Sequence, residues 1–110
     1  CVGSIGVYMA LIDQTRAMEM AGLKMNLVKA GKFKAMGASF KELTDEERDL
    51  LQAEVDKIHK DFKTAVTTLR KAKDEDMQGQ WFDGTGAKAR NIVDEITFKN
   101  ADEWAAELAA

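Results

Sequence analysis

The sequence has few of the residues that build metal and disulfide sites. It contains one cysteine, Cys1, and one histidine, His59, among 110 residues. A single cysteine cannot close an internal disulfide, and no Cys/His spacing resembles a zinc site. Gly3 and Gly6 also lack the Gly-x-Gly-x-x-Gly spacing of a dinucleotide site. We therefore expect no metal and no cofactor, and we assign Cys1 no role.

The sequence also lacks a basic charge excess and a long apolar run. Its formal net charge is −3 and its pI is near 5.2, which is not the electrostatic footprint of a protein that binds nucleic acid. No uninterrupted apolar segment is long enough to span a bilayer. The composition, 45% hydrophobic and 32% charged, is that of an ordinary globular domain. A cytoplasmic and a membrane-associated parent protein are both compatible with these features.

The chain opens in the middle of a predicted strand. It has no initiator methionine, and Val2, Ile5 and Val7 form an apolar run that glycines interrupt. We therefore expect a fragment of a longer protein. Its 110 residues allow one domain at most.

The apolar pattern predicts a mixture of helices and short strands. After the opening strand we expect a helix over residues 8–21, a strand over 23–28 and a loop over 31–40. Strand, helix and strand in this order are what a right-handed crossover between parallel strands requires. Further predicted segments are an extended pair at 81–82, a short helix at 84–91, a strand or extended segment at 92–96 and a terminal helix at 101–109 with Asn100 or Asp102 near its N-cap.

A long amphipathic helix is the clearest predicted element. Thr44 followed by Glu47 forms a capping box that marks its start. Its apolar stripe repeats at spacings of three and four and consists of Leu51, Val55, Ile58, Phe62, Ala65 and Leu69. At about 1.5 Å per residue such a helix is longer than the diameter of a compact domain of this size. We expect the remainder of the parent protein or another subunit to cover its far end, and we favour a core-facing stripe over a dedicated dimer zipper.

Lys34 is the candidate for chemistry. A free lysine has a pKa near 10.4, so a lysine that acts as a base must be desolvated and must have no carboxylate partner. Apolar residues such as Phe33 flank Lys34, the nearest acid in sequence is Glu42, and Lys29 and Lys32 add like-charge repulsion. Taken alone, the run is more typical of a basic surface loop.

Three other residues have a structural interpretation. Ser4 does not fit the Gly-x-Ser-x-Gly pattern of a nucleophile turn, and a strand position before Ile5 is poorly exposed. Ser39 is five residues from Lys34, and a loop of that length sets no geometry. His59 falls on the flank of the long helix, where we expect it to be solvated.

Several segments together resemble the C-terminal part of the signal peptide peptidase A (SppA) family. They are Val2-Gly3-Ser4-Ile5-Gly6-Val7, the run from Leu27 to Gly37, Leu43-Thr44-Asp45-Glu46-Glu47, Phe82-Asp83-Gly84 and Asn91-Ile92-Val93-Asp94-Glu95. Each motif is short, and the specificity lies in their order and spacing. Within the family, the Tyr8-Met9-Ala10 continuation and the Leu43-Thr44-Asp45-Glu46-Glu47 helix start most resemble the shorter, single-repeat and prophage-type members, which include capsid-assembly proteases.

The resemblance implies a fold and an assembly. The fold is an α/β, ClpP/crotonase-like spiral, of which residues 1–110 would form the C-terminal portion of one domain, with short strands and one long amphipathic helix. It also implies a ring-shaped homo-oligomer that acts on peptide or protein substrates, such as signal-peptide remnants or scaffold proteins.

The resemblance also implies a serine-lysine mechanism. Gly31-Lys32-Phe33-Lys34 matches the Gly-x-x-Lys element of the family, which makes Lys34 the general base. The family's serine lies upstream of Cys1, so this fragment alone is expected to be inactive. The alternative is a catalytically silent oligomerisation or assembly module of the same fold. The two functions differ in whether the parent chain has that serine.

Overall fold

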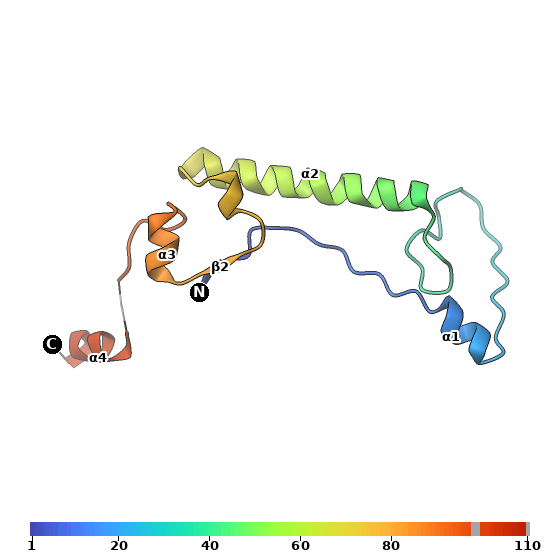
Figure 1. Ribbon diagram of the computed structural model, residues 1–110, viewed down its shortest axis with the longest axis horizontal. Coiled ribbons are helices and arrows are strands. Elements are labelled where there is room, and N and C mark those ends of the chain that lie inside the picture. Colours follow the sequence, from blue (N-terminus) through green and yellow to red (C-terminus); the bar gives the residue numbers. More distant parts are fainter. Residues whose placement is uncertain (98–99, 110) are drawn as a thin grey trace. The chain divides into compact units, whose positions relative to one another are not determined.

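The computed structural model describes residues 1–97 and 100–109 (Figure 1). The chain divides into two compact units, Cys1–Val7 with Ile58–Ala110, and Tyr8–Lys57. In chain order the elements are β1 (Val2–Gly3), α1 (Thr15–Met20), α2 (Asp45–Leu69), the 3-10 helix η1 (Asp74–Asp76), β2 (Trp81–Phe82), α3 (Gly84–Ala89) and α4 (Ala101–Ala109). Among these described helices, none is both long and apolar enough to cross a bilayer.

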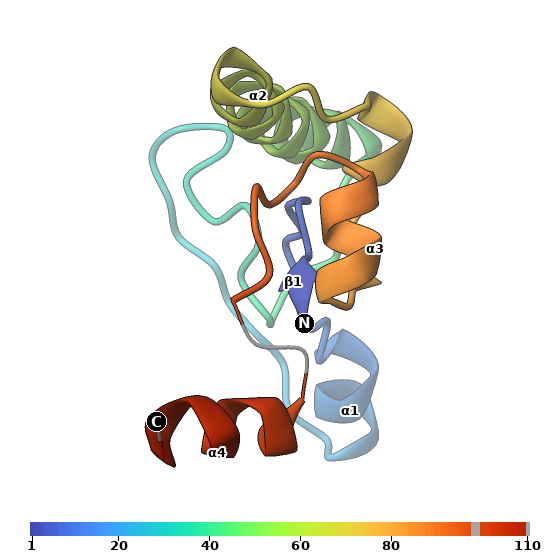
Figure 2. The ribbon, with the colours of Figure 1, turned by 90° about the vertical axis from the view of Figure 1, so that its left-hand side faces the viewer.

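A two-stranded antiparallel sheet organises the first unit. Val2 of β1 lies opposite Phe82 of β2, and α3 lies beside β1 (Figure 2). The Ser4 amide donates to the Gln80 carbonyl at 2.7 Å, which continues the pairing beyond the strand. Gly3 has a φ of 133°, and a Cβ at this position would collide with the Gln80 carbonyl oxygen. Only glycine fits this close approach of two backbones.

Among the described residues, the buried apolar side chains all belong to this first unit. They are Ile5, Met77, Ala87 and Ile92. The helix that carries Ala87 is capped by Asp83, whose Oδ1 accepts the Gly86 amide at 2.7 Å. The Ile92 amide donates back to the Ala87 carbonyl at 2.9 Å and closes the other end of α3.

The second unit corrects two predicted elements, of which the first is the helix expected over residues 8–21. Only Thr15–Met20 is helical. Asp13 Oδ1 accepts both the amide and the hydroxyl of Thr15, at 2.9 and 2.6 Å, so this local turn competes with helical hydrogen bonding before residue 15. Gly22, with a φ of 75°, ends the helix as expected.

The second correction concerns the strand expected over residues 23–28. These residues are exposed and belong to no sheet. An alternating sequence makes an extended conformation favourable, but a strand also needs a hydrogen-bonded neighbour. No segment within 1–97 and 100–109 pairs with it, and the predicted parallel crossover is therefore absent from the described residues.

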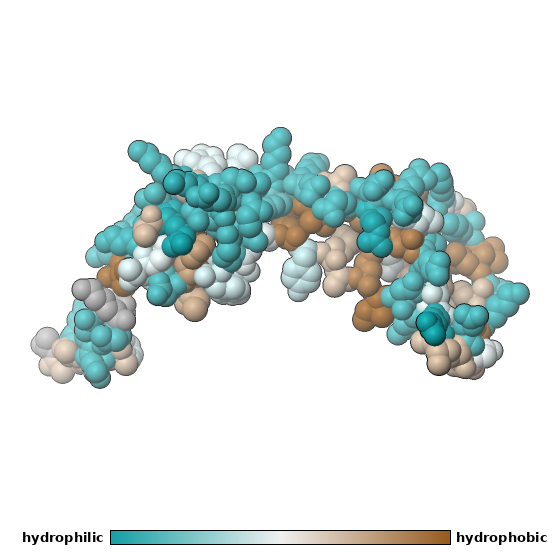
Figure 3. Space-filling model, viewed as in Figure 1, coloured by the Kyte–Doolittle hydropathy of each residue, from teal (hydrophilic) through white to brown (hydrophobic). Residues whose placement is uncertain are grey.

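The long helix α2 begins as the capping box predicts. The Glu47 amide donates to Thr44 Oγ1 at 3.1 Å, and the Thr44 amide donates to Glu47 Oε1 at 3.0 Å. The apolar stripe is only partly covered, since Leu51 is half-buried whereas Phe62 is 42% and Leu69 is 86% exposed. Figure 3 shows apolar surface among the polar side chains.

The terminal elements follow the sequence more closely. Asn100 Oδ1 accepts the Glu103 amide at 2.9 Å, so Asn100 acts as the cap of α4. The predicted short helix at 84–91 ends at Ala89, and residues 92–96 are not paired in a sheet. The described residues thus contain the short strands and the one long helix that the sequence predicts. The ClpP/crotonase-like spiral, which needs more elements than these, stays a prediction.

Candidate active site

Lys34 lies in a succession of tight turns that we call the lysine segment (residues 29–41). Its amide donates to the Gly31 carbonyl at 3.2 Å, and Gly31 has a φ of 96° that favours glycine. Further turn hydrogen bonds run from Met36 to Phe33 at 3.1 Å, from Ala38 to Ala35 at 3.1 Å and from Lys41 to Ala38 at 3.4 Å. A continuous series of backbone contacts therefore links Lys34 to Lys41.

The lysine segment is also joined to the chain that precedes it. The Gln14 amide donates to the Ser39 carbonyl at 2.7 Å. Gly37 faces Leu11, whose methyl groups lie 3.5 Å from where a Cβ would be. The turns therefore rest on residues 11–14 rather than projecting freely.

The three lysines around the Gly-x-x-Lys element differ in their partners. Lys29 Nζ donates to the Lys32 carbonyl at 2.9 Å. Lys32 Nζ lies 2.7 Å from Glu46 Oε2 and 5.3 Å from the centre of the Phe33 ring. The Lys34 side chain is exposed, and no described residue accepts a hydrogen bond from its amine or forms an ion pair with it. Lys32 thus has a carboxylate partner and Lys29 a backbone carbonyl partner, whereas the Lys34 amine has neither among the described residues. Lys34 therefore meets the requirement that a base lysine have no carboxylate partner.

The first turn of α2 holds the far end of the lysine segment. Lys41 Nζ donates to Glu47 Oε1 at 2.5 Å and to the Glu42 carbonyl at 2.8 Å. The hydrogen bond from Lys41, followed by that from the Thr44 amide, lowers the pKa of Glu47 from 4.5 to about 2. Glu47 is therefore ionised near neutral pH, and its ion pair with Lys41 is intact.

Neither serine lies in an arrangement that activates it. Ser4 has a φ of 56°, and its backbone is held by Gln80 in the first unit, whereas Lys34 belongs to the second unit. Ser39 is half-buried in the lysine segment. Among the described residues, no hydrogen bond joins the Ser39 hydroxyl to Lys34.

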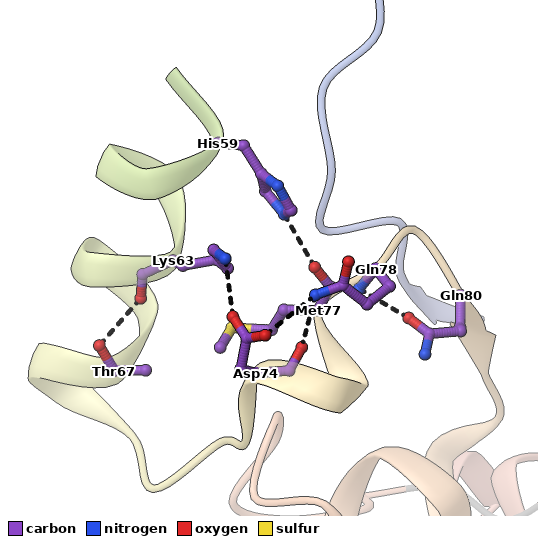
Figure 4. A network of polar contacts seen from close by, with 7 residues as sticks. All are labelled: His59, Lys63, Thr67, Asp74, Met77, Gln78 and Gln80. Carbon is purple, nitrogen blue, oxygen red and sulfur yellow. Dashed lines mark hydrogen bonds and ion pairs between the residues drawn. The ribbon is translucent and has the colours of Figure 1, made fainter. Parts of the chain in front are cut away.

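His59 has a structural role that the sequence did not predict. We expected a solvated flank, but His59 is half-buried and its Nε2 lies 2.8 Å from the Met77 carbonyl oxygen (Figure 4). Nearby, Lys63 Nζ donates to Asp74 Oδ1 at 2.7 Å and lowers the pKa of Asp74. Met77 itself is 1% exposed. This network joins α2 to the segment after it, and contacts between residues 18 apart have no local sequence signal.

An open depression in the second unit is lined by Thr15, Arg16, Glu19, Met20 and Glu42. Lys34 is not among its lining residues. Its walls contain no lysine, cysteine or serine, so we assign it no chemistry.

Comparison with known proteins supports a peptidase. Residues 1–110 match the family described as "Peptidase family S49". A Methanocaldococcus jannaschii protein named "Putative protease MJ0651" is 34% identical over 104 residues, which cover 86% of this chain and 32% of that protein. A Synechocystis protein named "Putative protease slr0021" is 32% identical over 112 residues, which cover 97% of this chain and 40% of that protein. The chain thus spans well under half the length of these relatives.

Proposed function

The chain belongs to peptidase family S49, and from this premise we propose that it is the lysine-bearing part of a serine peptidase with Lys34 as general base. Membership confirms the resemblance to SppA-like peptidases. The family and the names of the relatives support peptide-bond hydrolysis as the reaction. The serine-lysine dyad is the finer part of the proposal.

Lys34 is assigned as the general base because its amine has no hydrogen-bond or ion-pair partner among the described residues. Lys29 and Lys32 are engaged with a backbone carbonyl and a carboxylate, whereas the amine of Lys34 is uncommitted among the described residues. Because Lys34 is exposed, the apolar cover that a base lysine needs must come from a bound substrate or from the rest of the parent protein.

The proposed mechanism uses this amine to activate a serine upstream of Cys1. Neutral Lys34 takes the proton of the serine hydroxyl, and the alkoxide attacks the carbonyl carbon of an extended peptide. Backbone amides stabilise the oxyanion, and water later hydrolyses the acyl-enzyme. Without that serine, residues 1–110 alone would be inactive. We propose peptide or protein substrates, such as signal-peptide remnants or scaffold proteins.

The test uses the parent protein and a fluorophosphonate probe, followed by peptide mass mapping. We expect labelling of one serine upstream of Cys1. Lys34→Ala should abolish this labelling and lower kcat by about 10²- to 10⁴-fold, the usual contribution of a general base. Lys29→Ala is the matched control and should retain both the serine labelling and the kcat of the parent protein. Retained activity in Lys34→Ala would contradict the assignment.

A second proposal concerns assembly. The partly exposed stripe of α2, with Ile58 at 50% and Phe62 at 42% exposure, favours packing against further protein. We propose that this packing includes other copies of the chain, in a ring. The same surface supports the alternative of a catalytically silent assembly module. A folded parent that assembles but is not labelled by the probe would favour that alternative.

A further inference from the structure

Glu47 is the only charged residue that is buried within residues 1–97 and 100–109, with 3% exposure. A buried carboxylate is unfavourable unless hydrogen bonds and an opposite charge compensate it. Glu47 Oε1 accepts from Lys41 and from the Thr44 amide, whereas Oε2 is buried and has no hydrogen-bond partner among the described residues. Compensation of the charge therefore depends on Lys41.

The contact between Glu47 and Lys41 bears on Lys34 through the lysine segment. The series of backbone turns begins at Gly31, includes Lys34 and ends at Lys41. The Lys41 ammonium group donates a hydrogen bond to Glu47 Oε1. On the other side of Lys34, Lys32 pairs with the adjacent Glu46. The consecutive residues Glu46 and Glu47, in the first turn of α2, thus form ion pairs with one lysine before Lys34 and one after it. Lys34 itself forms no ion pair with a described residue.

The two ion pairs differ in their expected effect. The side chains of Lys32 and Glu46 are 70% and 57% exposed, and an ion pair with such exposure contributes little to the stability of the lysine segment. The side chains of Lys41 and Glu47 are 20% and 4% exposed, so solvent screens this pair much less. The anchoring therefore depends mainly on Glu47 and Lys41.

We propose that Glu47, acting through Lys41, is a positioning residue for the Lys34 base. The pair fixes the lysine segment on the start of α2 and so sets where the Lys34 amine points. This inference rests on the proposed function of Lys34. Neither Glu47 nor Lys41 is expected to touch the substrate.

Two substitutions separate positioning from helix capping. Glu47→Gln keeps an oxygen that can accept from the Thr44 amide but removes the charge that holds Lys41. Lys41→Met removes the cation and leaves the capping box intact. If Glu47 only caps α2, Lys41→Met should leave catalysis unchanged, whereas if the pair positions Lys34, both variants should be impaired.

The experiment measures kcat and KM of the parent protein on a peptide substrate, with active sites counted by fluorophosphonate labelling carried to completion, because a displaced Lys34 slows labelling as well as turnover. We expect both variants to lose roughly 10- to 100-fold in kcat per active site, because small displacements of a catalytic group have effects of this size. KM should stay within about twofold, since substrate contacts are unchanged. Lys41→Arg should restore most of the lost kcat, and the exposed first-turn control Asp45→Asn should behave as the parent does.

The outcomes distinguish this inference from the proposed function. If Lys34→Ala is active, the proposed function fails and the inference fails with it. If Lys34→Ala is inactive but Lys41→Met has the parent's kcat per active site, the inference alone is wrong. If Glu47→Gln does not fold, Lys41→Met and Lys41→Arg decide the matter, because both retain the capping box. A loss of kcat that Lys41→Arg does not restore would also overturn the inference.

Discussion

One carboxylate oxygen, Glu47 Oε1, accepts hydrogen bonds from both the Thr44 amide and Lys41 Nζ. The first contact is local in sequence and belongs to the capping box. The second joins the helix start to the lysine segment and could not be read from the sequence, because a surface glutamate and a surface lysine have many possible partners. At the scale of single residues, the capping partner was predictable and the charge partner was not.

The lowered pKa of Glu47 predicts acid sensitivity. The folded state holds this pKa at about 2, below the usual 4.5, so the ionised carboxylate stabilises the fold. This stability is fully present above about pH 4.5 and is lost as the pH falls from there toward 2. Thermal unfolding of the parent between pH 7 and 2 should show this loss, and Glu47→Gln should lose less stability across the same window.

The control for this pH prediction is Asp45→Asn, which removes an exposed acid from the same helix turn and should keep the parent's slope. Asp13 and Asp74 also have lowered pKa values, through Thr15 and Lys63, so some acid sensitivity should persist in Glu47→Gln. Identical slopes for the parent and Glu47→Gln would show that Glu47 contributes nothing to acid stability.

At the scale of elements, the predictions were correct where a capping pattern sets a helix start, and wrong where a partner strand was missing or a local turn competed with the helix. The helix α2 and the cap of α4 depend on side chains within a few residues, and the sequence predicted both starts. The strand expected over 23–28 needs a distant neighbour, and alternation alone could not supply it. The helix expected over 8–21 lacks its first half, where Thr15 donates hydrogen bonds from its amide and hydroxyl to Asp13 Oδ1.

The exposed part of the α2 stripe leads to a prediction about assembly. Phe62 is 42% exposed, so a charge placed there should leave the helix intact but oppose packing against another subunit. We expect Phe62→Glu to lower the molar mass of the parent assembly, measured by light scattering. Lys60→Glu, which lies off the stripe, is the control and should leave the mass unchanged. An unchanged mass in both variants would exclude this face from the interface.

At the scale of the whole molecule, the buried apolar side chains lie in the first unit and the candidate base lies in the second. Met77 is the largest fully buried side chain among the described residues, and His59 holds its carbonyl. Apolar burial therefore stabilises the first unit, whereas the second unit contains the buried carboxylate of Glu47 and its ion pair with Lys41.

Within the first unit, the difference in burial predicts a contrast between Met77→Ala and Leu69→Ala. Met77 is 1% exposed, and its truncation should lower the free energy of unfolding by about 2 to 5 kcal/mol. Leu69 is 86% exposed, and its truncation should change that free energy by no more than about 0.5 kcal/mol. Urea denaturation of the parent protein measures both. Equal losses would mean that Leu69 is covered by another part of the parent or by another subunit.

The family, the long helix and the lysine that matches the Gly-x-x-Lys element follow from the sequence alone, because motifs, helical periodicity and caps are local patterns. The folded chain was needed to show that Lys29 and Lys32 have hydrogen-bond or ion-pair partners, that Glu47 is buried against Lys41 and that His59 contacts the Met77 carbonyl. These contacts depend on how the turns fold, even where the partners are close in sequence, as Lys29 and Lys32 or Lys41 and Glu47 are. Composition, spacing and capping patterns do not encode how the turns fold.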